Sequence, residues 1–361
     1  MDIRIGDFKT TTVMRDYVNE ILDNNRITEH CFVKRLEEKM AKFLGVKHAI
    51  AVTNGTLSLE MLGHYLRMSY GQLTVCVPAL TFPATINAFI NTGHKVILCD
   101  VKEDLTIDLD TLSKEDRLNI NVIVPVHLMG YSCDMDKVLE FKTRYGWDYI
   151  IEDCAESFGS KFNNKKVGTI GDFGSFSFYV SHNIAGGELG LVVTNNDEDA
   201  KILRSIKNHG RDNSSPLEFK HDYVGSNYKI TEFVAAIGLA NMNNVEEILK
   251  KRFDNAIFYK EHITNNRLSP FNVTKNDSLL GYPIKVIDGN IDVICKLLND
   301  NGIETRKMFP CLANQKAYNI NNTYDVATEL EQSVFYVGVH HLLSDIDKKK
   351  IVTILNSYKG E

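Results

Sequence analysis

The sequence lacks the features that mark membrane, secreted and nucleic-acid-binding proteins. No apolar run reaches the length of about 18 residues that a membrane helix needs, and the segment from Met1 to Leu22 has no apolar core of signal-peptide length. The chain carries 41 basic and 47 acidic residues, a net charge of −6, and the basic residues gather in no patch that could follow a phosphate backbone. These absences predict a soluble, cytoplasmic protein with neither a membrane nor a nucleic acid among its partners.

Cysteine and histidine are present, but not at metal-binding spacing. The seven cysteines form no C-x-C or C-x-x-C pair. No i,i+4 pair and no pair with cysteine is formed by His127, His209, His221, His340 or His341. Several cysteines lie inside apolar runs such as Leu73–Val77, where a thiol behaves as a small hydrophobic group. We therefore expect buried, reduced thiols and no metal site. The cysteines are Cys31, Cys76, Cys99, Cys133, Cys154, Cys295 and Cys311.

What the chain does contain is a regular alternation of predicted strands and helices. Short apolar runs rich in β-branched residues predict buried strands, and most gaps between them show helical periodicity. Because this alternation requires crossover connections, the sequence predicts an α/β fold with a doubly wound, mostly parallel sheet. The predicted strands are Ala49–Thr53, Leu73–Val77, Lys95–Cys99, Val122–Val126, Tyr149–Glu152 and Gly190–Thr194, and helices are predicted at Leu57–Met68, Pro83–Asn91 and Met135–Tyr145.

The pattern of the chain changes after about residue 244. A long charged helix is predicted from Val245 to about Ile263, followed by weaker strands near Leu280–Ile287 and a closing helix at Asp345–Ser357. A length of 361 residues suits one large α/β domain with a smaller companion. We therefore predict a large domain at residues 1–244, which includes an N-terminal helical segment, and a small C-terminal α/β domain at residues 245–361.

The turn Thr53-Asn54-Gly55-Thr56 joins a predicted strand to a predicted helix. Helix N-termini present unpaired amide groups and a partial positive charge, and Gly55 lets the backbone approach an anion closely. The pattern favours a phosphate site, although the same residue types also form ordinary turns.

A second candidate site is the run Ile150–Glu156, where an apolar strand ends on two acids. Asp153 should lie at the carboxyl end of this strand, the end at which open α/β sheets bind ligands. A buried carboxylate needs a cationic partner, and a protonated pyridine nitrogen is one. An aspartate that caps the following turn is the alternative interpretation.

From Gly174 to Thr194 the sequence resembles the sugar-nucleotide aminotransferase family (DegT/DnrJ/EryC/StrS type) of fold-type-I pyridoxal phosphate enzymes. This family makes amino sugars for surface polysaccharides and antibiotics. The resemblance covers nearly the whole chain, and the number and order of the motifs argue against chance similarity. The other motifs are Phe43–Thr56, Val77–Thr85, Val126–Gly130, Glu152–Glu156, Gly225–Glu232 and Ala235–Ala240.

The resemblance implies that the cofactor is pyridoxal 5'-phosphate or its pyridoxamine form. The backbone amides of Gly55 and Thr56 and the hydroxyl of Ser177 would hold the cofactor phosphate. Phe82 would stack on the cofactor ring.

Three further residues would act on the cofactor ring or across a subunit boundary. Asp153 would pair with the pyridinium nitrogen and keep it protonated, the condition under which the ring is an electron sink. Glu156 would lie near the ring hydroxyl. Asn227 would reach the phosphate of the neighbouring subunit, which implies a homodimer with shared active sites.

One position departs from the aminotransferases. Where they carry the lysine that holds the cofactor covalently, this chain reads Ser181-His182-Asn183-Ile184. An imidazole cannot form that covalent bond, but it can accept a proton near neutral pH. The substitution predicts a noncovalently held cofactor and a reaction that depends on proton transfer by His182.

Histidine at this position resembles the 3-dehydratases of 3,6-dideoxysugar pathways, and most closely those of colitose biosynthesis. The stretches Phe162–Lys165 and Phe335–His340 are similar to these enzymes, and the lack of a close cysteine pair favours the kind without an iron–sulfur cluster. The resemblance implies that L-glutamate first supplies an amine to the cofactor. A nucleotide-linked 4-keto-6-deoxy sugar would then lose its 3-hydroxyl, with His182 as the base and ammonia as a product.

Two other interpretations remain open. His182 could mark a lost activity, in a cofactor-binding relic or a regulatory paralogue. The chain could also be a glutamate-dependent nucleotide-sugar aminotransferase, with Lys207 or Lys229 near the site. Neither the nucleotide nor the sugar can be read from the sequence, because their contacts are expected from variable loops such as Asp212–Tyr223. The sequence also departs from the family at Leu189, where glycine is usual.

Overall fold

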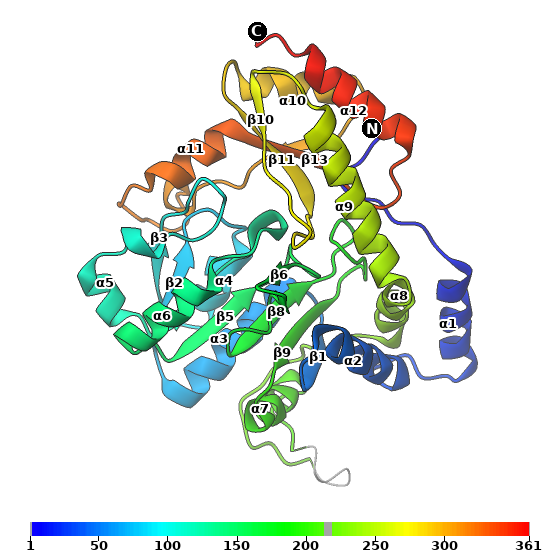
Figure 1. The fold of residues 1–361 in the computed structure, drawn as a ribbon. Helices are drawn as coiled ribbons and strands as arrows, with labels where there is room; N and C mark the ends of the chain where they lie inside the picture. The colour runs from blue at the N-terminus through cyan, green and yellow to red at the C-terminus, as the bar shows by residue number, and fades with distance from the viewer. Residues whose placement is uncertain (1, 213–218, 361) are drawn as a thin grey trace.

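The chain folds around a seven-stranded sheet with helices on both faces (Figure 1). The computed structural model describes residues 2–212 and 219–360. The strand order is β1-β9-β8-β5-β4-β2-β3, and every neighbouring pair is parallel except the two pairs that involve β9. The strands are β1 (His48–Val52), β2 (Thr74–Pro78), β3 (Lys95–Cys99), β4 (Val122–Ile123), β5 (Tyr149–Asp153), β8 (Phe173–Ser177) and β9 (Gly190–Thr194).

Each face of the sheet packs against its own layer of helices because successive strand residues point to opposite sides. Val75 and Val77 of β2 belong to the core beneath α3 and α4, whereas Cys76 between them belongs to the core beneath α6. The first layer holds α3 (Gly55–Tyr70), α4 (Ala84–Asn91) and α7 (Asp197–Lys207); the second holds α2 (Cys31–Leu44), α6 (Met135–Tyr145) and α8 (Glu232–Met242), with α1 (Thr12–Asp23) against α8 and the short α5 (Lys114–Asn119) at the edge.

A second, four-stranded antiparallel sheet has the order β10-β11-β13-β12 and its own hydrophobic core. The start of the chain belongs to this part, since Ile3 is buried in the same core and pairs with Ile303. The first residues of the chain therefore pack with the C-terminal part. The division at residue 244 remains a prediction. The elements are α9 (Val245–His262), β10 (Leu268–Pro270), β11 (Gly281–Val286), α10 (Ile291–Asp300), β12 (Thr305–Lys307), α11 (Asp325–Ser333), β13 (Val334–Gly338) and α12 (Asp345–Ser357).

The predicted α/β class with a mostly parallel sheet is confirmed, with three corrections to the elements. The strand expected at Val122–Val126 has only two ladder residues, because Pro125 has no amide hydrogen to donate. Strand β8 is not among the strands that the apolar runs predict. The antiparallel direction of β9 is not predicted either, and it follows because the chain returns from β8 through a loop without a crossover helix.

Two general expectations can be compared with the fold. Among the described residues, no helix is both long enough and apolar enough to cross a membrane; the cytoplasmic location stays a prediction. All seven cysteines lie in the described part of the chain and are free, and five of them are buried, as expected, whereas Cys31 and Cys295 are partly exposed.

A short hairpin of β6 (Lys161–Phe162) and β7 (Lys165–Lys166) turns at Asn163 and Asn164, both in the left-handed region that such turns require.

Candidate active site

A pocket of about 380 Å³ opens where the carboxyl ends of β5 and β8 meet the start of α3, with one wall from the second sheet. This is the edge at which parallel α/β sheets bind ligands. The pocket brings together seven of the eight residues that the sequence analysis selected. It is lined by Asn54, Gly55, Thr56, Leu59, Thr81, Phe82, Ala84, Thr85, Val126, Leu128, Asp153, Ala155, Glu156, Ser177, Tyr179, Ser181, His182, Gly187, Glu188, Leu189, Leu280, Arg306, Phe309 and Tyr336.

The first end of the pocket is an anion cradle at the N-terminus of α3. The side chain of Asn54 caps the helix by accepting from the amide of Leu57 at 2.9 Å. The described residues supply no hydrogen-bond acceptor to the amides of Gly55 and Thr56, which remain available to a ligand. A Cβ atom on Gly55 would lie 2.6 Å from Cβ of Ser177, so only glycine lets the helix start beside that hydroxyl. Two amides, a helix dipole and a hydroxyl together suit a phosphate group.

Asp153 ends β5 and lies inside the pocket, 3% exposed. One carboxylate oxygen accepts from the hydroxyl of Thr85 at 2.9 Å, and the other accepts from the amide of Ala155 at 3.1 Å. Burial raises the pKa of Asp153, while these two hydrogen bonds and the charge of His127 act to lower it. A cation placed against this carboxylate would remove the cost of its burial, and the protonated nitrogen of a pyridine ring supplies one.

Glu156 and Phe82 complete the part of the wall that suits a flat ring. Glu156 is buried, and one carboxylate oxygen accepts from the amide of Met129 at 2.8 Å. Burial raises the pKa of Glu156 to about 7. Phe82 is 54% exposed, and its ring meets Phe309 edge to face at a centroid distance of 5.5 Å. A large aromatic face left open beside two carboxylates is consistent with ring stacking. The residues present therefore fit pyridoxal phosphate, although the position of each relative to that molecule remains a prediction.

The second end of the pocket is formed by His182, which follows β8 and is partly buried. Its Nδ1 atom lies 3.2 Å from the carbonyl oxygen of Ser177. The backbone carbonyls of Ser177 and Ala155 both accept from the ring and act to raise its pKa, and a neutral imidazole keeps one N–H group and one acceptor nitrogen. Burial lowers the pKa of His182 to about 4, so the ring is neutral at physiological pH. The ring of Tyr179 stands edge to face with it, at 6.0 Å between centroids.

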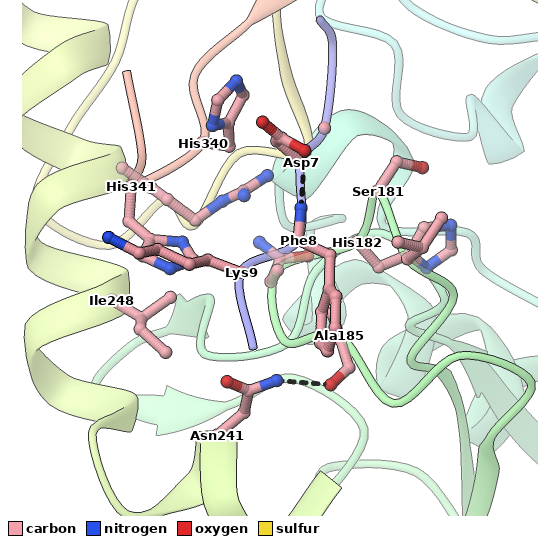
Figure 2. Close-up of a pocket in the computed structure, with 14 residues that line it drawn as sticks. Asp7, Phe8, Lys9, Ser181, His182, Ala185, Asn241, Ile248, His340 and His341 are labelled. Atoms are coloured by element: carbon pink, nitrogen blue, oxygen red, sulfur yellow. Dashed lines mark hydrogen bonds between the residues drawn. The ribbon is translucent and has the colours of Figure 1, made fainter. Parts of the chain in front are cut away.

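A small second cavity lies behind the loop that carries His182 (Figure 2). The N-terminal segment Gly6–Lys9 forms one side, and a Cβ atom on Gly6 would lie 2.3 Å from Cα of Ser181. Asn183 fastens the same loop from the other side, because its amide group donates to the carbonyl and to the hydroxyl of Ser278, both at 2.8 Å. His182 is therefore held on a loop that is packed between the N-terminal segment and the residues before β11.

The other acid of β5, Glu152, has a structural role. Glu152 is fully buried on the other side of the strand and accepts from the amides of Gly168, Ile170 and Gly171. It also lies 3.0 Å from Nε2 of His127. The sequence analysis paired no histidine with cysteine, but the fold brings His127 and Glu152 together with Cys154 within metal-ligand reach. Since the carboxylate is already filled by backbone donors, the cluster acts as a buried structural network.

Asn227 and the two lysines proposed as alternatives lie outside the pocket of a single chain. Asn227 is exposed and pairs with Asn208, so its role toward a neighbouring subunit stays a prediction. Lys207 is buried in ion pairs with Glu29 and Glu37, and Lys229 donates to Asn208 at 2.7 Å. Among the described residues that line the pocket there is no lysine.

The structure also adds residues that the sequence analysis did not select. Arg306, Phe309 and Tyr336 enter the pocket from β12, β13 and the loop between them, more than a hundred residues away from β8 in sequence. No local motif marks them, because only the packing of the second sheet on the first brings them in. Leu189 lines the pocket, but it also packs in the core under α8, close to Gly238. Residues 213–218 of the loop Asp212–Tyr223 lie outside the described residues.

Comparison with known proteins places this geometry in context. A model of the DegT/DnrJ/EryC1/StrS aminotransferase family matches residues 10–356. GDP-perosamine synthase of Vibrio cholerae is 30% identical over 329 residues, 86% of this chain and 88% of the relative. The enzyme of the same name from Caulobacter vibrioides is 34% identical over 305 residues, 82% of this chain and 81% of the relative.

Solved structures of similar fold include an aminotransferase and a dehydratase. Helicobacter pylori PseC, an aminotransferase involved in the biosynthesis of pseudoaminic acid, has a TM-score of 0.91 at 22% identity and covers 98% of each chain. Escherichia coli GDP-4-keto-6-deoxy-D-mannose-3-dehydratase with bound hydrated PLP has a TM-score of 0.90 at 23% identity, over 98% of this chain and 99% of that chain. At these identities the likeness shows the fold alone, whereas the family match extends to sequence. The chain belongs to the DegT/DnrJ/EryC1/StrS aminotransferase family, whose enzymes work with pyridoxal 5'-phosphate.

Proposed function

We propose that this protein is a 3-dehydratase that removes the C3 hydroxyl of a nucleotide-linked 4-keto-6-deoxy sugar. The observation that carries the proposal is His182, which stands at the family's lysine position and lines a pocket without a lysine among its described residues. A neutral imidazole can accept a proton at its unprotonated nitrogen but cannot attach the cofactor covalently. The complete set of Gly55, Asp153 and Ser177 argues against a relic, because these groups suit a bound cofactor rather than a packed core.

In this proposal the protein residues hold the reactants and move one proton. Bound pyridoxamine phosphate supplies an amine for the 4-keto group and an electron sink. Asp153 keeps the charge that such a sink requires, and the amides at the start of α3 hold the phosphate at the opposite end. The unprotonated ring nitrogen of His182 would accept one proton from the bound reactants, and the C3 hydroxyl would take up a proton and leave as water as the C3–O bond breaks.

The overall reaction balances with L-glutamate as the reductant. Glutamate and water give 2-oxoglutarate, ammonia and two reducing equivalents, which replace the C3 hydroxyl by hydrogen and release water. The nitrogen leaves as ammonia because the described residues that line the pocket include no lysine that could recapture the cofactor and so retain the amine on the sugar.

Amine transfer is the second candidate function, and the curated relatives favour it. Both relatives described above are named GDP-perosamine synthase, and the fold neighbour from Helicobacter pylori is an aminotransferase. The dehydratase neighbour and these relatives share GDP in their names, so GDP-linked 4-keto-6-deoxymannose is the first substrate to test. A relative at 29% identity, Salmonella typhimurium RfbH, is named for lipopolysaccharide biosynthesis, which suits a product destined for surface polysaccharide.

The proposal is tested with purified protein, pyridoxal phosphate, L-glutamate and a panel of GDP-, CDP-, dTDP- and UDP-linked 4-keto-6-deoxy sugars. The mass of the sugar product and the free ammonia are measured together. A product that has lost one oxygen atom, with ammonia released, supports dehydration. A product that carries a new amine contradicts it and establishes the aminotransferase.

A second test addresses how the cofactor is held. Borohydride reduction followed by intact-protein mass spectrometry should leave the wild-type chain without a covalent cofactor. His182→Lys, treated in parallel, should gain the mass of a reduced cofactor adduct. A stable adduct on the wild-type chain would show that some lysine takes over the missing role.

A further inference from the structure

The pocket contains two buried carboxylates and few charges to balance them. Asp153 is 3% exposed and Glu156 is 7% exposed. Among the described residues of the wall, one permanent cation is present, the guanidinium of Arg306. That group is largely exposed and already pairs with Glu304 at 3.0 Å. Two carboxylates that share one low-dielectric site do not both ionise easily, so one of them is expected to hold a proton.

The hydrogen bonds decide which carboxylate holds the proton. Both oxygens of Asp153 are occupied, one by the hydroxyl of Thr85 and the other by the amide of Ala155. Glu156 accepts a single hydrogen bond, from the amide of Met129 to Oε2. The ionised form is therefore better supported at Asp153 than at Glu156. Burial and the nearby charge of Asp153 raise the pKa of Glu156 to about 7, in the same direction as this argument.

The remaining groups that face Glu156 do not reverse this order. From the second sheet come the hydroxyl of Tyr336, whose pKa is raised by burial, and Arg306, whose side chain is largely exposed. From the loop after β8 comes His182, which is neutral at physiological pH. No positively charged group among the described residues lowers the pKa of Glu156; only the hydrogen bond from the amide of Met129 does so.

We propose that Glu156 enters the cofactor complex as a carboxylic acid and donates a hydrogen bond to the ring hydroxyl oxygen, while Asp153 remains ionised against the ring nitrogen. The ring oxygen of pyridoxal phosphate is negative when the ring nitrogen is protonated. An ionised Glu156 would repel it, whereas the acid stabilises it. The proposal rests on the placement of the cofactor in this pocket and is independent of whether the reaction is dehydration or amine transfer.

The consequence is a proton linked to cofactor binding. Above about pH 7 the free protein must take up a proton at Glu156 before it binds, so the affinity should fall by up to about tenfold for each further pH unit. The ring nitrogen and the phosphate of the free cofactor titrate in this range as well. A variant that changes only Glu156 separates its contribution from theirs.

The test is a titration of the full chain with pyridoxal phosphate, followed by absorbance, between about pH 6 and about pH 9. Neither glutamate nor a sugar is added, so failure of the dehydratase proposal cannot affect the result. Glu156→Gln, which always presents a donor, should bind within a few-fold of the wild type at the lowest pH and show a shallower loss of affinity above about pH 7. A variant that binds weakly throughout with the wild-type slope would overturn the proposal, because Glu156 would then act as an anion.

A second measurement, on the wild-type protein, tests the same proposal if Glu156→Gln does not fold. The infrared difference spectrum of wild-type protein with and without the cofactor, at about pH 8, reports directly on buried carboxyl groups. The stretch of a protonated carboxyl should appear when the cofactor binds. Its absence would mean that Glu156 stays ionised in the complex and would overturn the proposal.

Discussion

The phosphate end of the pocket and its His182 end are built from different kinds of structure. At the proposed phosphate end, the groups that face the pocket are backbone amides at the start of α3 and a hydroxyl at the end of β8, all fixed by regular elements. At the other end, the proposed chemistry depends on one side chain, His182, on a loop that the N-terminal segment and Ser278 hold in place. The difference suggests that cofactor binding and reaction type can change independently, since a substitution on the loop leaves the cradle intact.

The largest expected effect comes from removing the base while the cradle is kept. His182→Asn should lower the rate of dehydration by about 10² to 10⁴-fold, the usual contribution of a general base. Pyridoxal phosphate affinity should change less than about tenfold, because Asp153 and the amides at Gly55 and Thr56 are untouched. Steady-state turnover and an absorbance titration measure the two quantities separately. Unchanged turnover would contradict the role of His182.

The next effect should come from the carboxylate at the ring nitrogen. Asp153→Asn keeps the shape but removes the charge, and loss of one partner of a buried charge pair costs about 2–5 kcal/mol. The cofactor affinity should therefore fall by about 30-fold or more. Thr85→Val, which removes only the supporting hydroxyl, is the matched control and should have a smaller effect. Equal losses in the two variants would show that the charge of Asp153 is not what binds the ring.

A smaller effect is expected at the phosphate cradle. Gly55→Ala forces a Cβ atom to within 2.6 Å of Ser177 Cβ, so the start of α3 must shift away from the hydroxyl. We expect a loss of cofactor affinity of about tenfold or more, the value of one to two hydrogen bonds to a charged group. Ser177→Ala removes the hydroxyl without the clash and should lose less. Reduced turnover with unchanged cofactor affinity in Gly55→Ala would contradict the difference drawn between the two ends of the pocket.

The last prediction concerns the stability of the protein rather than its activity, at the His182 end. Burial lowers the pKa values of His182 and His340 to about 4, so below pH 6.5 the unfolded chain binds protons that the folded chain resists. Stability from this source is present above about pH 6.5 and is lost as the pH falls toward about 4, by up to about 3 kcal/mol per residue. Urea unfolding of the cofactor-free protein at several pH values measures it. His340→Gln should reduce the loss, whereas the exposed His262→Gln should not.

The sequence predicted the pocket residues at the ends of strands and helices better than the pocket residues that the second sheet contributes, for a physical reason. Gly55, Thr56, Asp153 and Ser177 lie at strand ends and helix starts, where local pattern fixes the geometry, and the structure brings them together. Arg306 and Tyr336 could not be found in this way, because they reach the pocket only through packing of the second sheet.

The strands show the same division. Lys95–Cys99 and Gly190–Thr194 agree with their predicted bounds, since their apolar runs are uninterrupted. The strand at Val122 is shorter than predicted because of Pro125, and the antiparallel direction of β9 depends on a connection whose course local periodicity does not specify.

The stoichiometry of ammonia to 2-oxoglutarate tests the central claim most directly. Wild-type protein with pyridoxal phosphate, L-glutamate and GDP-linked 4-keto-6-deoxymannose should release ammonia and 2-oxoglutarate in equal amounts as the sugar loses its C3 oxygen. Formation of 2-oxoglutarate without ammonia, with the nitrogen recovered in the sugar, would contradict the account and identify an aminotransferase that works without the usual lysine.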